Sequence, residues 1–188
     1  MKAFAGMSLL ASLLIVVSAC GQDSGTPGRR FAAPEVQEKF DQAMVYSGQG
    51  RTVDSIALYS EAIELDPLFV NAYFDRAVDH YAMTRYEQAR LDYDRVIELD
   101  PSIAKAFLNR GRCYQKLGQH EKAIADFDQA FSLEPFKAVY SLKTRSYVMM
   151  GKQDDAGREL ELGVTAGYTR HYMEWVIESA NKALRLGY

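Results

Sequence analysis

The chain has 188 residues, of which 48% are hydrophobic and 25% are charged, a length and composition typical of a globular protein with one domain or two small ones. Its formal net charge is −3, so it lacks the strongly basic balance typical of nucleic-acid-binding proteins, and we expect no nucleic-acid partner.

The first twenty residues have the pattern of a secretory signal. Lys2 is followed by no charged residue up to Cys20, and the apolar run LLASLLIVV is too short to span a bilayer comfortably. The run ends in Val17-Ser18-Ala19-Cys20, which resembles the lipobox of bacterial lipoproteins. That resemblance implies a signal peptide over residues 1–19, cleavage before Cys20 and lipidation of its thiol. The alternative is an ordinary signal cut nearby, with Cys20 unmodified.

Residues 20–33 are expected to be a flexible tether that follows the lipidated cysteine. The segment GQDSGTPGRRFAA is rich in Gly, Ser and Pro and has few side chains to bury. Gly21 directly after the cysteine resembles the enteric lipoproteins that reach the outer membrane and face the periplasm. If Cys20 carries lipid, Cys113 has no partner within the chain, and we expect it to be packed as an inert thiol.

The pentapeptide IELDP occurs at residues 63–67 and again at 97–101, and this spacing is typical of repeats with a period of about 34 residues. Four units follow this period: 36–69, 70–103, 104–137 and 137–168. Within them, small residues at the eighth and twentieth places predict two helices that approach closely, and a large residue at the twenty-fourth place fills the space beside them. These three places hold Ala43, Ala77, Gly111 and Thr144; Ser55, Ala89, Ala123 and Ala156; and Tyr59, Tyr93, Phe127 and Leu160.

This pattern resembles the tetratricopeptide repeat (TPR), a helix-turn-helix unit of about 34 residues. The resemblance implies an all-α fold: a right-handed α-solenoid of about four units over residues 34–168. Gly50, Gly118 and Gly151 follow the first helix of their units, where a left-handed residue ends a helix. Thr84 holds that place in the second unit, so its turn is expected to be strained or differently shaped.

Opposite charges recur at the seventh and twenty-third places of three units. The pairs are Arg76 with Asp92, Arg110 with Asp126, and Lys143 with Glu159. We interpret them as ion pairs between the two helices of one unit. The alternative is independent, solvated charges. Asp79, at the tenth place, either faces solvent at the groove edge or binds a ligand.

Residues 169–188 are predicted to form a C-terminal helix that caps the stack, because a repeat array exposes its core at its ends. One stripe of this helix is polar, with His171, Glu174, Glu178, Asn181 and Arg185. The other is apolar, with Tyr172, Trp175, Val176, Ala180, Ala183 and Leu184. Trp175 is therefore expected in the core. The mixed charge of the polar stripe argues against a membrane-surface helix.

Catalytic and metal-binding patterns are missing from the sequence. It has no glycine-rich phosphate loop, and His120-Glu121 is not a zinc motif because Ile124 stands at the place of the second histidine. We therefore predict no catalytic residue, no metal site, no cofactor and no enzyme activity. An enzyme with an unrecognised site is the remaining alternative.

The resemblance to TPR proteins implies that a protein or peptide partner binds a concave groove formed by the first helix of each unit. The groove residues are Phe40, Met44, Asn71, Phe74, Asp75, Lys105, Asn109, Arg112, Lys116 and Arg145. They are apolar and slightly acidic at the start and basic further on, which suits an extended chain that carries carboxylates. We expect a membrane-anchored adaptor of the bacterial cell envelope; the alternative is a pilotin-like assembly factor for a secretin or outer-membrane protein complex. Partner, host and oligomeric state stay open.

Overall fold

The computed structural model describes residues 33–187, and this part of the chain is all-helical. The helices within this range are α1 (Pro34–Gly48), α2 (Thr52–Leu65), α3 (Val70–Ala82), α4 (Tyr86–Leu99), α5 (Ala104–Lys116), α6 (His120–Leu133), α7 (Ala138–Met149), α8 (Gln153–Thr165) and α9 (Arg170–Leu186). None of these helices is long and apolar enough to cross a membrane. The predicted signal, Cys20 and nearly all of the tether lie outside the described residues.

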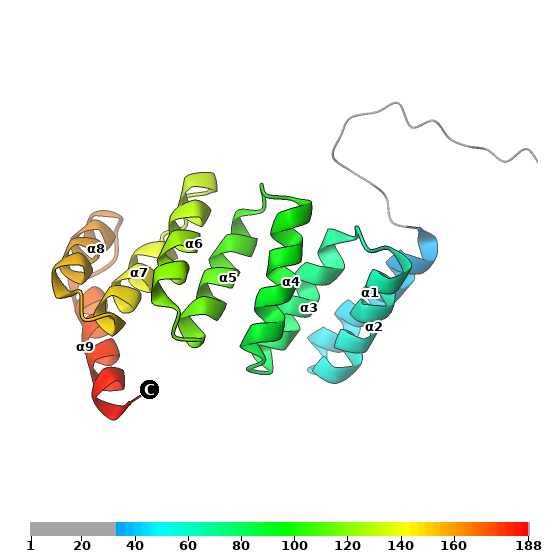
Figure 1. The fold of residues 1–188 in the computed structure, drawn as a ribbon, viewed down its shortest axis with the longest axis horizontal. Helices are drawn as coiled ribbons and strands as arrows, with labels where there is room; N and C mark the ends of the chain where they lie inside the picture. Colours follow the sequence, from blue (N-terminus) through cyan, green and yellow to red (C-terminus); the bar gives the residue numbers. More distant parts are fainter. Residues whose placement is uncertain (1–32, 188) are drawn as a thin grey trace, which may run out of the picture. The chain divides into compact units, whose positions relative to one another are not determined.

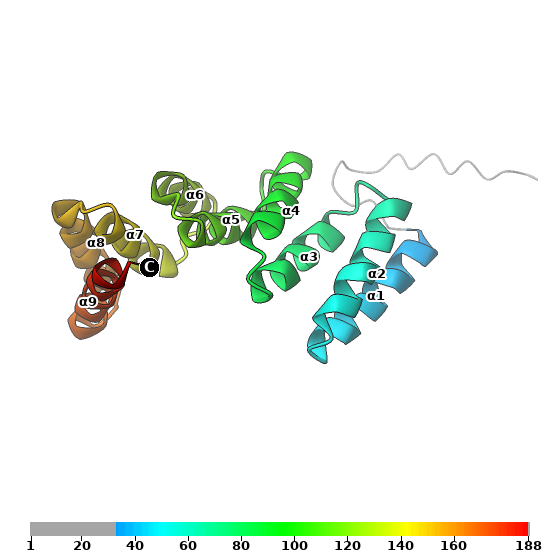
Figure 2. The same ribbon diagram turned by 60° about the horizontal axis from the view of Figure 1, so that its bottom comes forward.

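The helices of residues 33–187 pack in sequential pairs. α1 packs on α2, α3 on α4, α5 on α6 and α7 on α8, and each pair packs on the next in a row that Figure 1 shows from α1 to α8. In the turned view of Figure 2, the second helices α4 and α6 lie above the first helices α3 and α5. The predicted all-α solenoid of helix pairs is confirmed.

Each pair has the same turn between its two helices. Gly50, Gly118 and Gly151 have φ of +75°, +73° and +73°, as predicted. Thr84 adopts φ of 60° at the equivalent place, a conformation that costs a β-branched residue energy. In its turn the Arg85 amide donates to the His80 carbonyl at 2.9 Å, the same bond that closes the other three turns. The turn between α3 and α4 is therefore strained at Thr84, but it has the same shape as the other three turns.

Small side chains lie where the paired helices touch. Ala77, Ala89 and Ala123 are fully buried beside the rings of Tyr93 and Phe127, which fill the space next to them. The roles predicted for the small and large places of the repeat are those seen in the structure.

The three predicted ion pairs are present and partly buried. Arg76 and Arg110 each hold an aspartate through two hydrogen bonds, with Nη2–Oδ1 distances of 2.6 Å to Asp92 and 2.7 Å to Asp126. Lys143 lies 2.6 Å from a carboxylate oxygen of Glu159. The three acids are only 6–7% exposed, so the pairs are partly withdrawn from solvent.

Each of these three cations also bridges to the preceding helix pair, a contact that the repeat pattern does not predict. Arg76 Nη1 donates to Ser60 Oγ at 2.9 Å, Arg110 Nη1 to Asp94 Oδ1 at 2.7 Å, and Lys143 Nζ lies 2.8 Å from Asp128 Oδ1. Ser60, Asp94 and Asp128 all hold the twenty-fifth place of their units. One cation therefore links three helices at each junction.

Helix α9 packs against α7 and α8 and closes the end of the stack. Its buried residues are Met173, Val176 and Ala180, and a Cβ built on Gly163 would meet Met173 Cε at 2.7 Å. The prediction that Trp175 lies in the core is wrong, because its side chain is 56% exposed. The neighbouring helices bury Met173, Val176 and Ala180. They leave Tyr172, Trp175 and Leu184 exposed, so only part of the predicted apolar stripe is covered.

Candidate functional site

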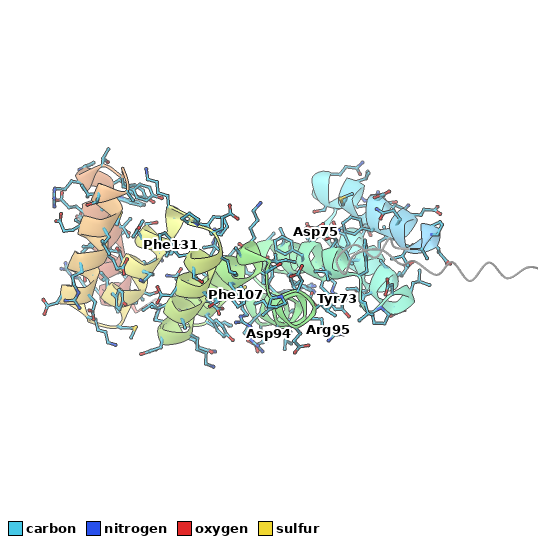
Figure 3. The ribbon with its side chains drawn as sticks, turned by 90° about the horizontal axis from the view of Figure 1, so that it is seen from above. Tyr73, Asp75, Asp94, Arg95, Phe107 and Phe131 are labelled. Carbon is cyan, nitrogen blue, oxygen red and sulfur yellow. The ribbon has the colours of Figure 1, made fainter. Side chains whose placement is uncertain are left out.

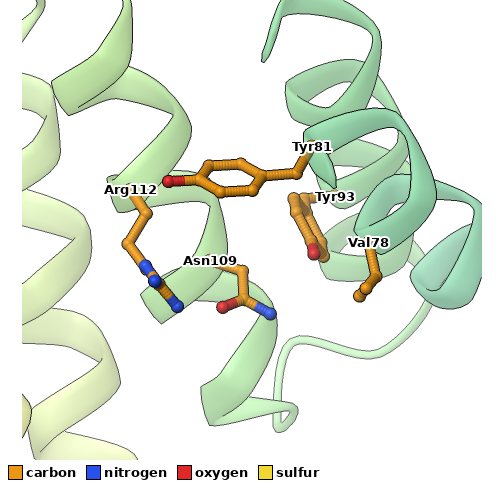
Figure 4. A pocket seen from close by; sticks show the side chains of 5 residues that line it. All are labelled: Val78, Tyr81, Tyr93, Asn109 and Arg112. Atoms are coloured by element: carbon orange, nitrogen blue, oxygen red, sulfur yellow. The ribbon is translucent and has the colours of Figure 1, made fainter. Parts of the chain in front are cut away.

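Two cavities lie along the first helices of the central pairs, where the sequence predicted a groove. The first, here the Asp75 pocket, has a volume of about 280 Å³. Its lining residues come from α1, α3 and α5 and the residue before α5: Phe40, Val70, Asn71, Phe74, Asp75, Ile103 and Lys105. The second, here the Arg112 pocket, has a volume of about 170 Å³ and is lined by Val78, Tyr81, Tyr93, Asn109 and Arg112. Figure 4 shows these five side chains around one space between α3, α4 and α5.

Aromatic packing positions the walls of the Asp75 pocket. The Phe40 ring lies 5.6 Å from that of Tyr59 and 5.1 Å from that of Phe69, so the side chain is held from two sides. The Phe74 ring meets the Tyr93 ring edge-on at 5.5 Å. Aromatic pairs of this geometry are favourable beyond their buried area, which makes these walls rigid.

The carboxylate of Asp75 lies in an environment that disfavours its charge. Burial, together with the negative charge of Asp79 one turn further along α3, raises the pKa of Asp75 to about 6. Burial is also the main cause that raises the pKa of Tyr59 and Tyr93, so both phenols are neutral at physiological pH.

Asp79 is buried, which excludes the solvent-facing alternative of the sequence analysis. Its side chain is 4% exposed and accepts hydrogen bonds from Ser47 Oγ at 2.7 Å and from Ser55 Oγ. These two serines belong to α1 and α2, so the carboxylate joins three helices. Asp79 therefore forms a packing contact between the first helix pair and the second.

The Arg112 pocket brings a guanidinium, an amide and two phenols together. The Arg112 guanidinium carbon lies 5.6 Å from the centre of the Tyr81 ring, within the range of a cation–π contact. Figure 4 shows the Asn109 amide and the Arg112 guanidinium reaching into the same space. Amide and guanidinium groups of this kind can bind a peptide backbone and a carboxylate.

Four cations of the first helices differ from the cations that join the repeats. Within residues 33–187, the exposed side chains of Lys105, Arg112, Lys116 and Arg145 form no ion pair, whereas Arg76, Arg110 and Lys143 are all paired. The helices that carry them, α5 and α7, contain no Asp or Glu. Helices α1 and α3 contain five acids between them. Charge along the first helices therefore changes from acidic to basic.

The ten groove residues predicted from sequence are distributed as follows. Phe40, Asn71, Phe74, Asp75 and Lys105 line the Asp75 pocket, and Asn109 and Arg112 line the Arg112 pocket. Met44, Lys116 and Arg145 are exposed and line neither pocket.

Of the other lining residues, Val78 and Tyr81 hold groove places of the second unit, whereas sequence reasoning missed Val70, Tyr93 and Ile103. A signal for Tyr93 does exist in the repeat. Its place holds Tyr59 and Tyr93 in the first two units and Phe127 in the third, where Leu142 packs against the cluster around Phe127, so an aromatic ring recurs at this place.

The structure also locates the residues considered for other chemistry. Within residues 33–187 no three His, Cys, Asp or Glu side chains are grouped to hold a metal ion. Cys113 is buried, as predicted, and burial raises the pKa of its thiol to about 12. The thiol therefore stays protonated and unreactive at neutral pH.

Comparison with known protein families identifies two of the repeats. Residues 70–103 and residues 104–137 each match the tetratricopeptide repeat. Residues 70–137 thus match two such repeats, and they form the central part of the solenoid of helix pairs. A search of curated proteins finds no match to the chain.

Solved structures share this fold. The crystal structure of MamA is 24% identical over 71% of this chain and 80% of that chain, with a TM-score of 0.67. MamA from Desulfovibrio magneticus is 16% identical over 69% and 74%, with a TM-score of 0.66. The first TPR of Spaghetti (RPAP3), solved with the HSP90 peptide SRMEEVD, is 19% identical over 71% and 99%, with a TM-score of 0.56. At these identities the likeness concerns the fold.

Proposed function

We propose that this protein is an adaptor that binds an extended, acidic segment of another protein along α1, α3, α5 and α7. The observation that carries the proposal is the set of four exposed cations, Lys105, Arg112, Lys116 and Arg145, that form no ion pair in the described part of the chain. Unpaired arginine and lysine beside two cavities favour a ligand that brings the missing carboxylates.

The structural likeness to Spaghetti (RPAP3) supports this choice of ligand. That TPR was solved with a bound peptide, SRMEEVD, which contains three acidic residues. In the present chain the acidic part of such a ligand fits α5 and α7, since those helices contain no acid of their own.

We further propose that the adaptor is a lipoprotein of the bacterial cell envelope. Support comes from the sequence Val17-Ser18-Ala19-Cys20 after an apolar run, with Gly21 favouring the outer membrane facing the periplasm. Lipid on Cys20 gives stable anchoring only with more than one acyl chain, as lipoproteins have.

Metabolic palmitate labelling tests the anchor. The wild-type chain expressed in a bacterium should take up label, and Cys20→Ser should not, while Cys113→Ser should label like wild type. A wild-type chain that stays unlabelled contradicts the lipoprotein proposal.

Capture from detergent-solubilised envelope tests the adaptor. Arg112→Ala and Lys116→Ala should each reduce recovery of the partner, because both cations are exposed beside the groove. Lys122→Ala on α6 is the matched control and should not. A hydrolase or protease partner supports the adaptor, and a secretin or barrel-insertion partner would identify an assembly factor instead. Equal recovery with all three variants contradicts binding through the groove cations.

A further inference from the structure

The Asp75 pocket combines apolar walls with a single embedded carboxylate. Phe40, Phe74, Val70 and Ile103 supply hydrocarbon, and the two rings are fixed by their aromatic neighbours. Asp75 is the acidic member of the lining. A pocket of this kind suits a ligand group with an aliphatic body and a cationic end.

Asp75 has no partner among the described residues. Neither a hydrogen bond nor an ion pair reaches its carboxylate from residues 33–187. The other partly or fully buried acids near the helix junctions are satisfied: Asp79 by two serines, and Asp92 and Asp126 by arginines. Figure 3 shows Asp75 on the opposite side of the helix row from Asp94 and Arg95.

The groups around Asp75 do not replace the missing partner. Asp79 is negative, the phenols of Tyr59 and Tyr93 are neutral, and Lys105 is exposed and forms no ion pair with it. A partly desolvated carboxylate next to a second acid is unfavourable until a cation joins it. Aromatic walls add a cation–π contribution for such a group.

We propose that the Asp75 pocket binds the side chain of a lysine in the groove ligand, its methylenes against Phe40 and Phe74 and its ammonium on the Asp75 carboxylate. This inference rests on the proposed function, since it names a second anchor of the same ligand. Lysine fits better than arginine because a compact ammonium on a flexible stem suits a pocket with a single carboxylate, whereas a guanidinium is adapted to bidentate partners.

The two anchors together give the ligand a direction. Its lysine lies toward α1 and α3, and its carboxylates lie toward α5 and α7. The groove therefore favours a segment in which a lysine and an acidic group are separated by a spacer over a purely acidic segment of the same length. Charges of opposite sign at the two ends also disfavour the reversed orientation.

Fluorescence anisotropy with synthetic peptides tests this inference on the full chain in detergent. The probes are acetylated peptides with one lysine, a Gly/Ala spacer of increasing length, and two glutamates at a free carboxyl terminus. Replacing the lysine by norleucine, which keeps the stem and removes the charge, should weaken binding at the best spacer about tenfold, which corresponds to about 1.4 kcal/mol. An arginine peptide should fall between the two.

Variants of the chain assign the effect to the pocket. In Asp75→Asn the lysine and norleucine peptides should bind equally, whereas Asp41→Asn, an exposed acid on α1, should keep the tenfold difference. Binding of the lysine peptide to wild type should weaken between about pH 7.5 and pH 5.5, because Asp75 gains a proton, and Asp75→Asn should remove this dependence.

The two proposals fail in different ways. If norleucine binds wild type as tightly as lysine while glutamine in place of glutamate weakens binding, the lysine pocket is wrong and the acidic groove stands. If lysine matters but neither the glutamates nor Arg112→Ala affects binding, the acidic groove is wrong. Absence of binding at every spacer length contradicts both.

Discussion

Gly111 lies in the contact between α5 and α6, which leaves no room for a side chain. A Cβ at this position would lie 2.6 Å from Phe127 Cε1 and 3.1 Å from the carbonyl oxygen of Ala123. We expect Gly111→Ala to destabilise the fold by about 1–3 kcal/mol through overpacking. Urea unfolding followed by circular dichroism measures the change.

Gly157 in α8 provides the matched control. A Cβ atom at this position would have no neighbouring atom within 4 Å. Gly157→Ala should therefore stabilise the fold by up to about 1 kcal/mol, because alanine has the higher helix propensity. Equal effects of the two substitutions would contradict the close contact at Gly111.

Asp75 makes stability depend on pH in a defined direction. Its pKa is about 6 in the folded chain against an ordinary 3.8, so the folded state holds the proton more tightly. The favourable contribution is fully present below pH 3.8 and is lost as the pH rises through 6. Asp75→Asn should therefore raise Tm at about pH 7.5 by the equivalent of roughly 1–3 kcal/mol.

The same substitution should have a much smaller effect at about pH 4, where the wild-type carboxyl is protonated in the folded state and partly protonated in the unfolded state. Thermal scans at the two pH values make the comparison. A difference in Tm that does not change with pH would show that Asp75 is not desolvated as described.

At the scale of elements, the turn after α3 carries strain that the other turns avoid. Thr84 has φ of 60° where Gly50, Gly118 and Gly151 occur. Thr84→Gly should stabilise the fold by about 1 kcal/mol by removing a left-handed threonine. The reciprocal change, Gly118→Thr, should destabilise by at least as much, and denaturant midpoints compare them. Loss of stability in Thr84→Gly would contradict this account.

The ladder of cations ties each helix pair to the one before it. Arg110→Met leaves Asp126 partly buried and unpaired, which should cost about 3 kcal/mol, although Asp94 keeps Arg90 as a partner. Adding Asp126→Leu should restore most of that loss, since an apolar pair can replace a buried ion pair. Chemical denaturation of the two single variants and the double variant measures the coupling.

Arg95 and Glu98 form an exposed pair on α4 and serve as the control for the ladder. Arg95→Met should leave the denaturation midpoint unchanged, because an exposed ion pair contributes little to stability. If Arg110→Met were equally neutral, the ladder would contribute nothing measurable.

At the scale of the whole described region, α9 covers the end of the stack with its buried side chains, of which Met173 is the largest. Met173 is fully buried against Gly163, so Met173→Ala should open a cavity and cost about 2–4 kcal/mol. The loss should be local, because in a repeat array each unit contacts only its neighbours. Hydrogen exchange should accelerate in α7, α8 and α9 and change little in α3 and α4.

Trp175→Ala is the control in the same helix and should leave exchange unchanged, because the indole is exposed. It stacks on Tyr172, with ring centres 6.0 Å apart. Faster exchange in α7 and α8 after this substitution would mean that the tryptophan, and not Met173, holds the cap.

Most of the fold could be predicted from the sequence, but only part of the lining of the two pockets could. The period, the helix pairs and the left-handed turns depend on residues close together in the chain, such as Gly118 after α5. The lining of the Asp75 pocket depends on α1, α3 and Ile103 meeting in space, so Phe40 and Asp75 could be proposed for the groove while Ile103 could not.

The sequence by itself determined a stack of paired helices, because small residues at helix contacts, glycine at turns and proline at unit ends act locally and recur from one unit to the next. Only the tertiary structure decided which face of α9 is covered, why each ladder cation reaches back to the preceding pair, and that Asp75 stands without a partner in the described part of the chain. These features depend on how helices cross one another, and crossing is decided by packing between segments distant in sequence.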